Sequence, residues 1–202
     1  WFPGRDGGLA SAGMLAGEIS PSGRLPISIE ARPEDNPTYD NYYVEKPMTK
    51  RGHSTLNVTY GEGIFVGYRG YEKKGVSPLY PFGHGLTYTS FEYSDLMVSR
   101  NGDGVDVTLT VTNTGNFDAA EVVQIYVGED NPCVARPAKE LKGYDKVFIP
   151  KGESAVVTVR LPRSAFAFYD VDIHDWRINP GSFTIMVGAS SQDIKLKEHI
   201  IL

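Results

Sequence analysis

The sequence contains a single cysteine, Cys133, among its 202 residues. One thiol cannot form an internal disulfide bond, and without a second thiol it cannot anchor a metal cluster. No histidine lies near it in the sequence to activate it as a nucleophile. We therefore interpret Cys133 as a small loop or core residue.

Long apolar runs and clusters of positive charge are also missing. The apolar runs end after about five to eight residues, far short of the roughly 20 that a membrane-spanning helix needs. The formal net charge is −5, and the lysines and arginines are dispersed along the chain. A polyphosphate partner requires a basic patch or stripe. The sequence thus predicts a soluble protein that binds neither a membrane nor a nucleic acid.

No initiator methionine and no signal peptide open the sequence, which begins WFPG. This beginning is unsuited to an independent secondary-structure element. We expect the sequence to start inside a longer protein, so that any targeting segment is missing from it. Asn57 begins an Asn-X-Thr triplet, which would accept a glycan only in a secreted eukaryotic protein.

Residues 1–29 contain a glycine-rich turn, a stretch with small and apolar residues at helical spacing over residues 9–19, and a short strand-like run at residues 24–29. A glycine-rich loop before a helix can bind an anion, but Asp6 lies inside this turn and no Lys-Ser/Thr pair follows. A tight turn packed against a sheet is the favoured interpretation. Because one helix and one strand cannot bury an apolar face alone, we assign residues 1–45 to the tail of an α/β domain. Residues 32–50 are polar and predict a surface excursion.

Residues 60–91, YGEGIFVGYRGYEKKGVSPLYPFGHGLTYTSF, alternate aromatic residues and glycines too densely for a helix. We predict an ordered connector over residues 46–90. Polar groups among buried aromatics are either hydrogen-bonded structure or the rim of a site. Four residues are candidates for such a rim: Glu62, Arg69, Tyr71 and His84. No second metal ligand accompanies His84 at a suitable spacing, which argues against a metal site.

Seven strand-like runs follow the connector, separated by turns rich in glycine, asparagine and proline. They cover residues 91–99, 105–113, 121–127, 141–149, 155–161, 164–169 and 182–188. The pattern is typical of an immunoglobulin-like β-sandwich, so the predicted fold is mainly β, with a sandwich over residues 91–202. Within it, Trp176 is expected to be a core anchor; if it were exposed, it could stack on a sugar.

Several segments occur in an order that carries a family resemblance. They are WFPGRDGG followed by AGEISPSGRLPISI, then YGEGIFVGYRGYE, PLYPFGHGLTYTSFEYSDL, VTNTG, AEVVQIYV, RPAKELKGYDKV and NPGSFTIMVGASSQDI. Together they resemble the C-terminal portion of glycoside hydrolase family 3, the family of many β-glucosidases, β-xylosidases and related exo-acting enzymes. The resemblance covers essentially the whole chain.

The resemblance implies a particular division of labour. The chain would comprise the end of the α/β sandwich domain and a fibronectin type III-like domain. An aspartate nucleophile on a barrel and a glutamate acid/base would both lie upstream, so no catalytic residue is expected here. A retaining glycosidase needs two carboxyl groups roughly 5–5.5 Å apart, and neither Asp6 nor Glu62 matches the family's catalytic motifs.

The resemblance further implies no cofactor. The expected partners are the missing N-terminal catalytic domains and, through them, an oligosaccharide or disaccharide. The compartment does not follow from the residues themselves; the resemblance implies a periplasmic or extracellular protein. We expect the chain itself to be structural, and two roles remain open for it. It would either brace the catalytic domains or act alone as a carbohydrate- or surface-binding module, which a row of exposed aromatics would support.

Overall fold

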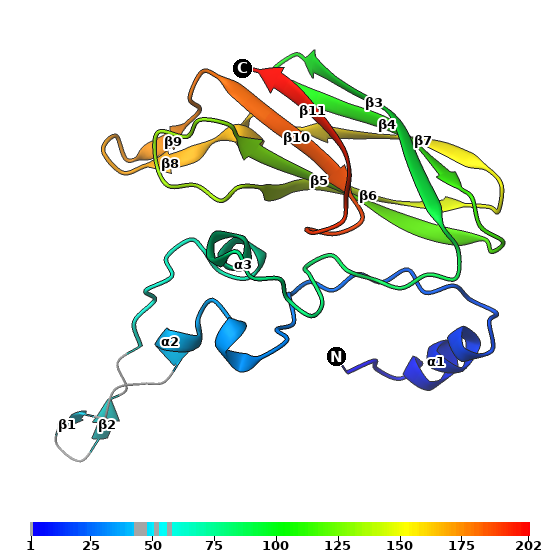
Figure 1. Ribbon diagram of the computed structural model, residues 1–202, viewed down its shortest axis with the longest axis horizontal. Helices are drawn as coiled ribbons and strands as arrows, with labels where there is room; N and C mark the ends of the chain where they lie inside the picture. Colours follow the sequence, from blue (N-terminus) through cyan, green and yellow to red (C-terminus); the bar gives the residue numbers. More distant parts are fainter. Residues whose placement is uncertain (1, 43–47, 51–52, 56–57) are drawn as a thin grey trace.

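Two antiparallel sheets pack face to face in the computed structural model, which describes residues 2–42, 48–50, 53–55 and 58–202 (Figure 1). The three-stranded sheet has the order β3-β4-β7, with β3 at Phe91–Asn101, β4 at Gly104–Asn113 and β7 at Ser154–Leu161. The four-stranded sheet has the order β11-β10-β5-β6, with β5 at Ala119–Glu129, β6 at Glu140–Ile149, β10 at Ser182–Gly188 and β11 at Ile194–Ile201. The β-sandwich expected from the sequence is confirmed.

The core lies between the two sheets. In β4 the apolar residues Val107, Leu109 and Val111 are fully buried, whereas the threonines between them are half-buried. Side chains at alternate positions of a strand point to one face, so these three meet residues such as Ile125 and Phe183 of the opposite sheet. Each buried apolar side chain of this size contributes about 1.5–3 kcal/mol.

The last third of the sandwich departs from prediction. The strand expected at residues 164–169 is instead a 3₁₀ turn, η2 at Arg163–Phe166, followed by the short strand β8 at Phe168–Asp170. β8 pairs with β9 at Asp175–Arg177 as a hairpin outside both large sheets. Strand β11 was not predicted, because its charged residues obscure the apolar alternation, as is common in edge strands.

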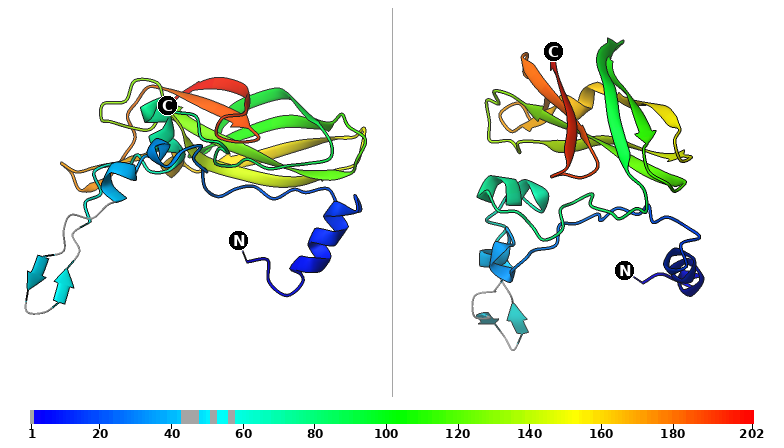
Figure 2. Two further views of the ribbon diagram at one scale, coloured as in Figure 1. Left: turned by 60° about the horizontal axis from the view of Figure 1, so that its bottom comes forward. Right: turned by 45° about the vertical axis from the view of Figure 1, so that its right-hand side comes forward.

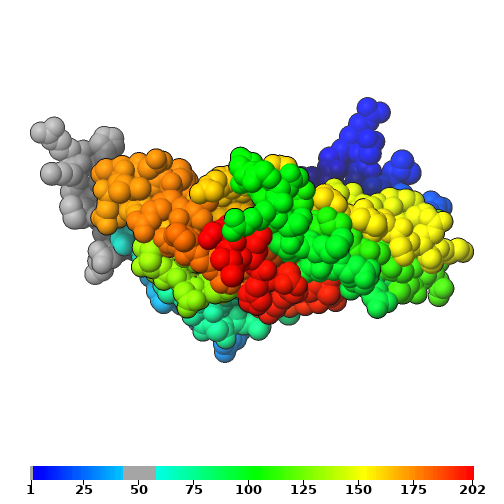
Figure 3. Space-filling model, turned by 90° about the horizontal axis from the view of Figure 1, so that it is seen from above, coloured from blue at the N-terminus to red at the C-terminus, as the bar shows by residue number. Residues whose placement is uncertain are grey.

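The N-terminal part contains helix α1 at Gly7–Leu15, η1 at Pro33–Asp35, α2 at Tyr39–Tyr42, β1 at Met48–Lys50 and β2 at His53–Thr55. Helix α1 stands out from the body of the molecule (Figures 2 and 3). The predicted strand at residues 24–29 joins no sheet. It is paired with the connector, since the Leu25 amide donates to the His84 carbonyl at 2.8 Å and the Ile29 amide donates to the Tyr80 carbonyl at 2.8 Å.

The connector contains a helix, α3 at Tyr68–Lys74, so the prediction that its residues are too crowded for a helix is wrong. Gly67 (φ 57°) and Gly75 (φ 65°) place turns at its two ends, and the side chain of Tyr71 is buried. Tertiary packing stabilises most short helices, because isolated ones are marginal in water. Helix α3 lies against the sandwich at the end where β5 meets β6 (Figure 1). None of the helices described is long and apolar enough to cross a membrane.

Candidate functional site

Helix α3 is attached to the sandwich by polar contacts from residues far away in the sequence. The Glu72 carboxylate forms an ion pair with Lys139, and the Leu141 amide donates to the Tyr68 hydroxyl oxygen at 2.9 Å. The Tyr68 ring also stacks on Phe82, with ring centroids 4.9 Å apart. The connector is therefore an ordered part of the domain.

A second attachment point is Gln124, which is 3% exposed on β5. Its side-chain amide nitrogen donates to the carbonyl oxygens of Gly83 and Ala189 at 3.1 and 2.6 Å, and its oxygen accepts from the Tyr126 hydroxyl at 2.7 Å. A buried amide is costly unless its groups are paired, and these three bonds pair both of its atoms. Gln124 thus holds the connector at Gly83.

The third attachment is an ion pair between Arg24, in the N-terminal segment, and Glu121 of β5. The Arg24 Nη2 and Glu121 Oε1 atoms are 2.6 Å apart, and the side chains are only 11% and 4% exposed. Glu121 also accepts the Val122 amide. Close by, burial and the Glu121 charge raise the pKa of Tyr93. Sequence reasoning missed Glu121 and Gln124, for which the only signal was a polar residue inside an apolar strand.

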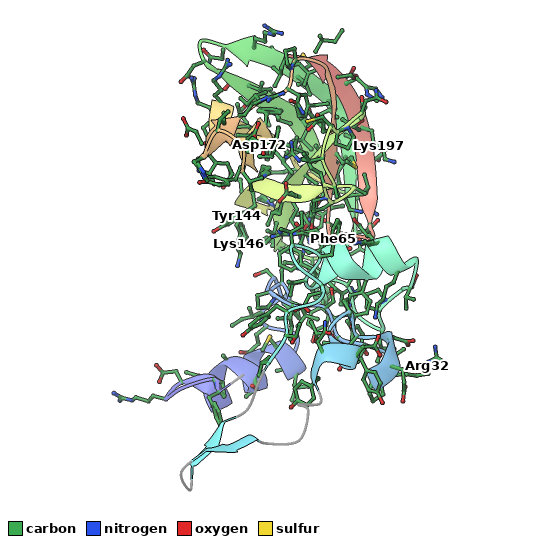
Figure 4. All side chains as sticks on the ribbon, turned by 90° about the vertical axis from the view of Figure 1, so that its left-hand side faces the viewer. Arg32, Phe65, Tyr144, Lys146, Asp172 and Lys197 are labelled. Atoms are coloured by element: carbon green, nitrogen blue, oxygen red, sulfur yellow. The ribbon has the colours of Figure 1, made fainter. Side chains whose placement is uncertain are left out.

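Glu62, the first candidate, is half-buried beside a hollow of ≈ 410 Å³. Its Oε2 atom accepts a hydrogen bond from the side-chain amide of Asn41 at 2.7 Å. Phe65 and Lys73 line the same hollow, and Figure 4 shows Phe65 beside α3. Within the described residues, the Glu62 carboxylate therefore has a hydrogen-bond partner in the N-terminal segment and borders this hollow.

Arg69, the second candidate, lines a different hollow and pairs with Glu140, with 3.7 Å between Nη1 and Oε1. Glu140 also lies 3.3 Å from both Arg136 and Lys142. Burial alone would raise the pKa of Glu140, but the charges of Lys142, Arg136 and Arg69 hold it below its usual value. Glu140 is therefore a carboxylate that joins the connector to β6.

Tyr71, the third candidate, is 2% exposed. Its hydroxyl oxygen has no hydrogen-bond partner within the described residues. Burial, together with the charges of Glu30 and Asp35, raises the pKa of Tyr71 to about 12. Tyr71 is placed to support the elements around it.

Replacing Tyr71 by phenylalanine is expected to change the free energy of unfolding by less than about 1 kcal/mol at pH 7, because the buried hydroxyl loses only its interaction with the nearby Glu30 carboxylate. The raised pKa favours the neutral hydroxyl in the folded state, so its contribution is complete below pH 10 and is lost between about pH 10 and 12. Urea unfolding from pH 7 to 11 should therefore show a weaker alkaline loss for Tyr71→Phe. Tyr60→Phe, which changes an exposed ring, should keep the full alkaline loss, and equal losses in the two variants would contradict the prediction.

His84, the fourth candidate, is half-buried, and its ring centroid lies 5.3 Å from that of Tyr80. It borders a mainly apolar hollow of ≈ 570 Å³ with Leu25, Ile29 and Leu86. Glu62 and Arg69 thus border two separate hollows and His84 borders two others, so the described residues do not gather these candidates at one hollow. No group of three His, Cys, Asp or Glu side chains in the described residues could hold a metal ion.

Two further side chains bear on the predictions. Trp176 is 65% exposed, so the expectation that it anchors the core is wrong; the hairpin that carries it lies outside the two large sheets. Cys133 is exposed in the loop before β6, where its sulfur accepts from the side-chain amide of Asn179 at 3.0 Å. Trp1 and Asn57 lie outside the described residues.

Family models match both parts of this arrangement. The glycosyl hydrolase family 3 C-terminal domain matches residues 1–68, and the fibronectin type III-like domain matches residues 121–191. The chain carries the C-terminal region of glycoside hydrolase family 3. The resemblance found in the sequence is confirmed.

Individual relatives support the same family assignment. The chain is 44% identical over 197 residues to the thermostable beta-glucosidase B of Acetivibrio thermocellus, covering 96% of this chain and 25% of that protein. It is also 44% identical over 195 residues to the exo-alpha-(1->6)-L-arabinopyranosidase of Bifidobacterium breve, with the same coverage of 96% and 25%. The chain therefore spans about a quarter of the length of these family 3 relatives.

The fold is similar to that of the crystal structure of a Bifidobacterium adolescentis GH3 beta-glucosidase. The TM-score is 0.89 and the identity 41%, and the match covers all of this chain and 29% of the glucosidase. The glucosidase, like the curated relatives, is therefore much longer than the region that this chain matches.

Proposed function

We propose that this family 3 region braces the catalytic domains of an enzyme that removes terminal β-linked sugars by the two-carboxylate retaining route. The buried Arg24–Glu121 pair is the observation that carries the proposal, because it locks the end of the family's C-terminal domain onto the fibronectin type III-like sandwich. Because this pair joins the N-terminal segment to the sandwich, a catalytic domain that packs on the N-terminal segment is also positioned relative to the sandwich. The proposed division is residues 1–45, 46–90 and 91–202.

A contact surface for those domains supports the proposal. Large apolar side chains are exposed on the side of the connector and the N-terminal segment: Leu15, Ile27, Leu86, Tyr144 and Phe148. Figure 4 shows Tyr144 at the border of the sandwich that faces this side. Large apolar side chains exposed on one side of a molecule are typical of a protein contact. The proposed occupant is the N-terminal part of the full-length enzyme.

The sugar specificity would then reside outside this chain. The two curated relatives compared above carry different activity names, a beta-glucosidase and an arabinopyranosidase, at the same 44% identity to this region. The proposed substrate is an oligosaccharide or disaccharide, and the proposed place is the periplasm or the cell exterior, in carbohydrate metabolism.

Hydrolysis assays test the proposal. The purified 202-residue chain is expected to release no aryl alcohol from aryl β-glycosides above buffer, because neither catalytic carboxylate is expected in it. The full-length protein should hydrolyse at least one such substrate with retention of configuration. Turnover by the isolated chain that disappears in Glu62→Ala would overturn the proposal, as would an inactive full-length protein.

We further propose that Glu62 acts at the rim of the substrate pocket in the full-length enzyme, positioning neighbouring loops. Alanine at this position should lower kcat/KM by about tenfold, equivalent to about 1.4 kcal/mol, without abolishing turnover. The thermal midpoint should stay within the range of an exposed control, Arg160→Ala. A lowered midpoint with unchanged kinetics would leave Glu62 with a packing role only.

A further inference from the structure

A hollow of ≈ 300 Å³ lies at the end of the sandwich that carries the β8–β9 hairpin, seen in orange in Figure 3. The connector supplies one wall, the beginning of β6 and its preceding loop supply the floor, and the hairpin supplies the other wall. The residues used in the following argument are Arg69, Arg136, Glu140, Lys142, Tyr169 and Trp176. None of them belongs to the surface assigned above to the catalytic domains.

The hairpin presents an aromatic platform to this hollow. The Trp176 indole is 65% exposed and the Tyr169 ring 48% exposed. The two rings meet edge to face, with centroids 5.8 Å apart and an interplanar angle of 80°. This arrangement stabilises the ring pair and still leaves aromatic surface open to a ligand. A tryptophan left exposed beside a hollow is typical of a binding site.

Polar groups of both kinds lie opposite the platform. Glu140 is a hydrogen-bond acceptor, held as a carboxylate by Arg69, Arg136 and Lys142. The 3.7 Å between Arg69 and Glu140 exceeds a direct hydrogen bond, so a ligand hydroxyl can donate to the carboxylate and accept from the guanidinium. These neighbouring ion pairs hold the polar wall in place before a ligand arrives.

The charge of the hollow narrows the class of ligand. Arg69, Arg136 and Lys142 are balanced by Glu140 and by Glu129, which lies 2.7 Å from Arg136. One positive charge remains in excess, which is too little for a polyanion. A sugar ring suits the site better, because it has an apolar C–H face for the aromatic platform and hydroxyl groups for the charged wall. A uronic acid could also use the excess charge.

We propose that this hollow is a sugar-binding site, separate from the catalytic centre, in which Trp176 stacks on a pyranose ring while Arg69, Glu140 and Lys142 bind its hydroxyl groups. The site would hold a carbohydrate chain on the enzyme without cleaving it. It does not depend on the brace proposed above, because it lies within the present chain.

Nuclear magnetic resonance of the ¹⁵N-labelled chain tests the proposal, since only Trp1 and Trp176 give indole N–H signals. Titration with cellotetraose, as a neutral probe, or with a tetragalacturonate, as an acidic one, should shift the Trp176 signal in a saturable way at millimolar concentrations. Trp176→Ala should abolish the binding seen by the backbone signals around Glu140, and Arg69→Ala should weaken it at least fivefold. Tyr144→Ala removes an equally exposed aromatic elsewhere and should leave binding unchanged.

Binding of either probe in this way supports the proposed site. The probe that binds more tightly shows whether the site prefers a neutral or an acidic sugar. The proposal is overturned if neither probe shifts Trp176, if Trp176→Ala binds as well as the unmodified chain, or if sodium sulfate reproduces the shifts. It is also overturned if full-length protein binds no sugar at this site while Trp176→Ala lowers its Tm, because the hollow would then be a contact between domains.

Discussion

Replacing Glu121 by alanine is expected to lower the free energy of unfolding by about 3–5 kcal/mol. The substitution leaves the Arg24 guanidinium in a space where its side chain is only 11% exposed, without the carboxylate 2.6 Å away that neutralises it. The Arg24 Nε atom already has no hydrogen-bond partner among the described residues. An uncompensated buried charge costs far more than a lost surface pair.

Urea unfolding of the chain, followed by circular dichroism, measures this effect. Arg24→Ala should cost a similar amount, and the double substitution should cost much less than the sum of the two. The matched control is Asp103→Ala, which removes an exposed partner of Arg160 and should cost less than about 1 kcal/mol. A loss below that value for Glu121→Ala would show that the pair does not hold the N-terminal segment on the sandwich.

Replacing Gly83 by alanine is expected to lower the free energy of unfolding by about 2–5 kcal/mol, the second large effect. The backbone of Gly83 has φ +82°, which costs a residue with a Cβ about 1–2 kcal/mol. In addition, the new methyl group would overlap the side-chain amide of Gln124, which would have to leave its buried hydrogen bonds at about 1–3 kcal/mol.

Gly63→Ala separates these two causes. Gly63 lies in the same connector and also has a positive φ, +56°, but no atom lies within 4 Å of the place a Cβ would occupy. It should lose only the backbone cost of about 1–2 kcal/mol. Equal losses for the two variants, measured by urea unfolding, would mean that the contact between Gly83 and Gln124 does not stabilise the connector.

The strands of the sandwich could be predicted because each carries its own burial pattern. Val107, Leu109 and Val111 alternate with threonines, and a period of two assigns every second side chain to the core wherever the strand lies. The turns between strands are equally local, since they depend on a few glycine, asparagine and proline residues. Strand β11 was not predicted because Glu198 interrupts its apolar alternation, at the edge of the sheet.

The connector could not be predicted in the same way. Its helix α3 has a glycine in the middle, Gly70, and seven residues are too few for stable helix formation on their own. What stabilises it is the burial of Tyr71 and the pairing of Glu72 with Lys139, 67 positions away. Trp176 shows the reverse case, because its apolar character suggested a core position that the sheets do not offer.

The sequence by itself thus determined the sandwich and the family to which the chain is similar, because alternation, turns and ordered motifs are local properties. The tertiary structure alone decided which polar residues join the parts. Arg24 and Glu121 are 97 positions apart, and their pairing depends on desolvation in an interface that exists only after both segments have folded. Tertiary packing also places Glu62, Arg69 and His84 at different hollows, although they lie within one short stretch of the sequence.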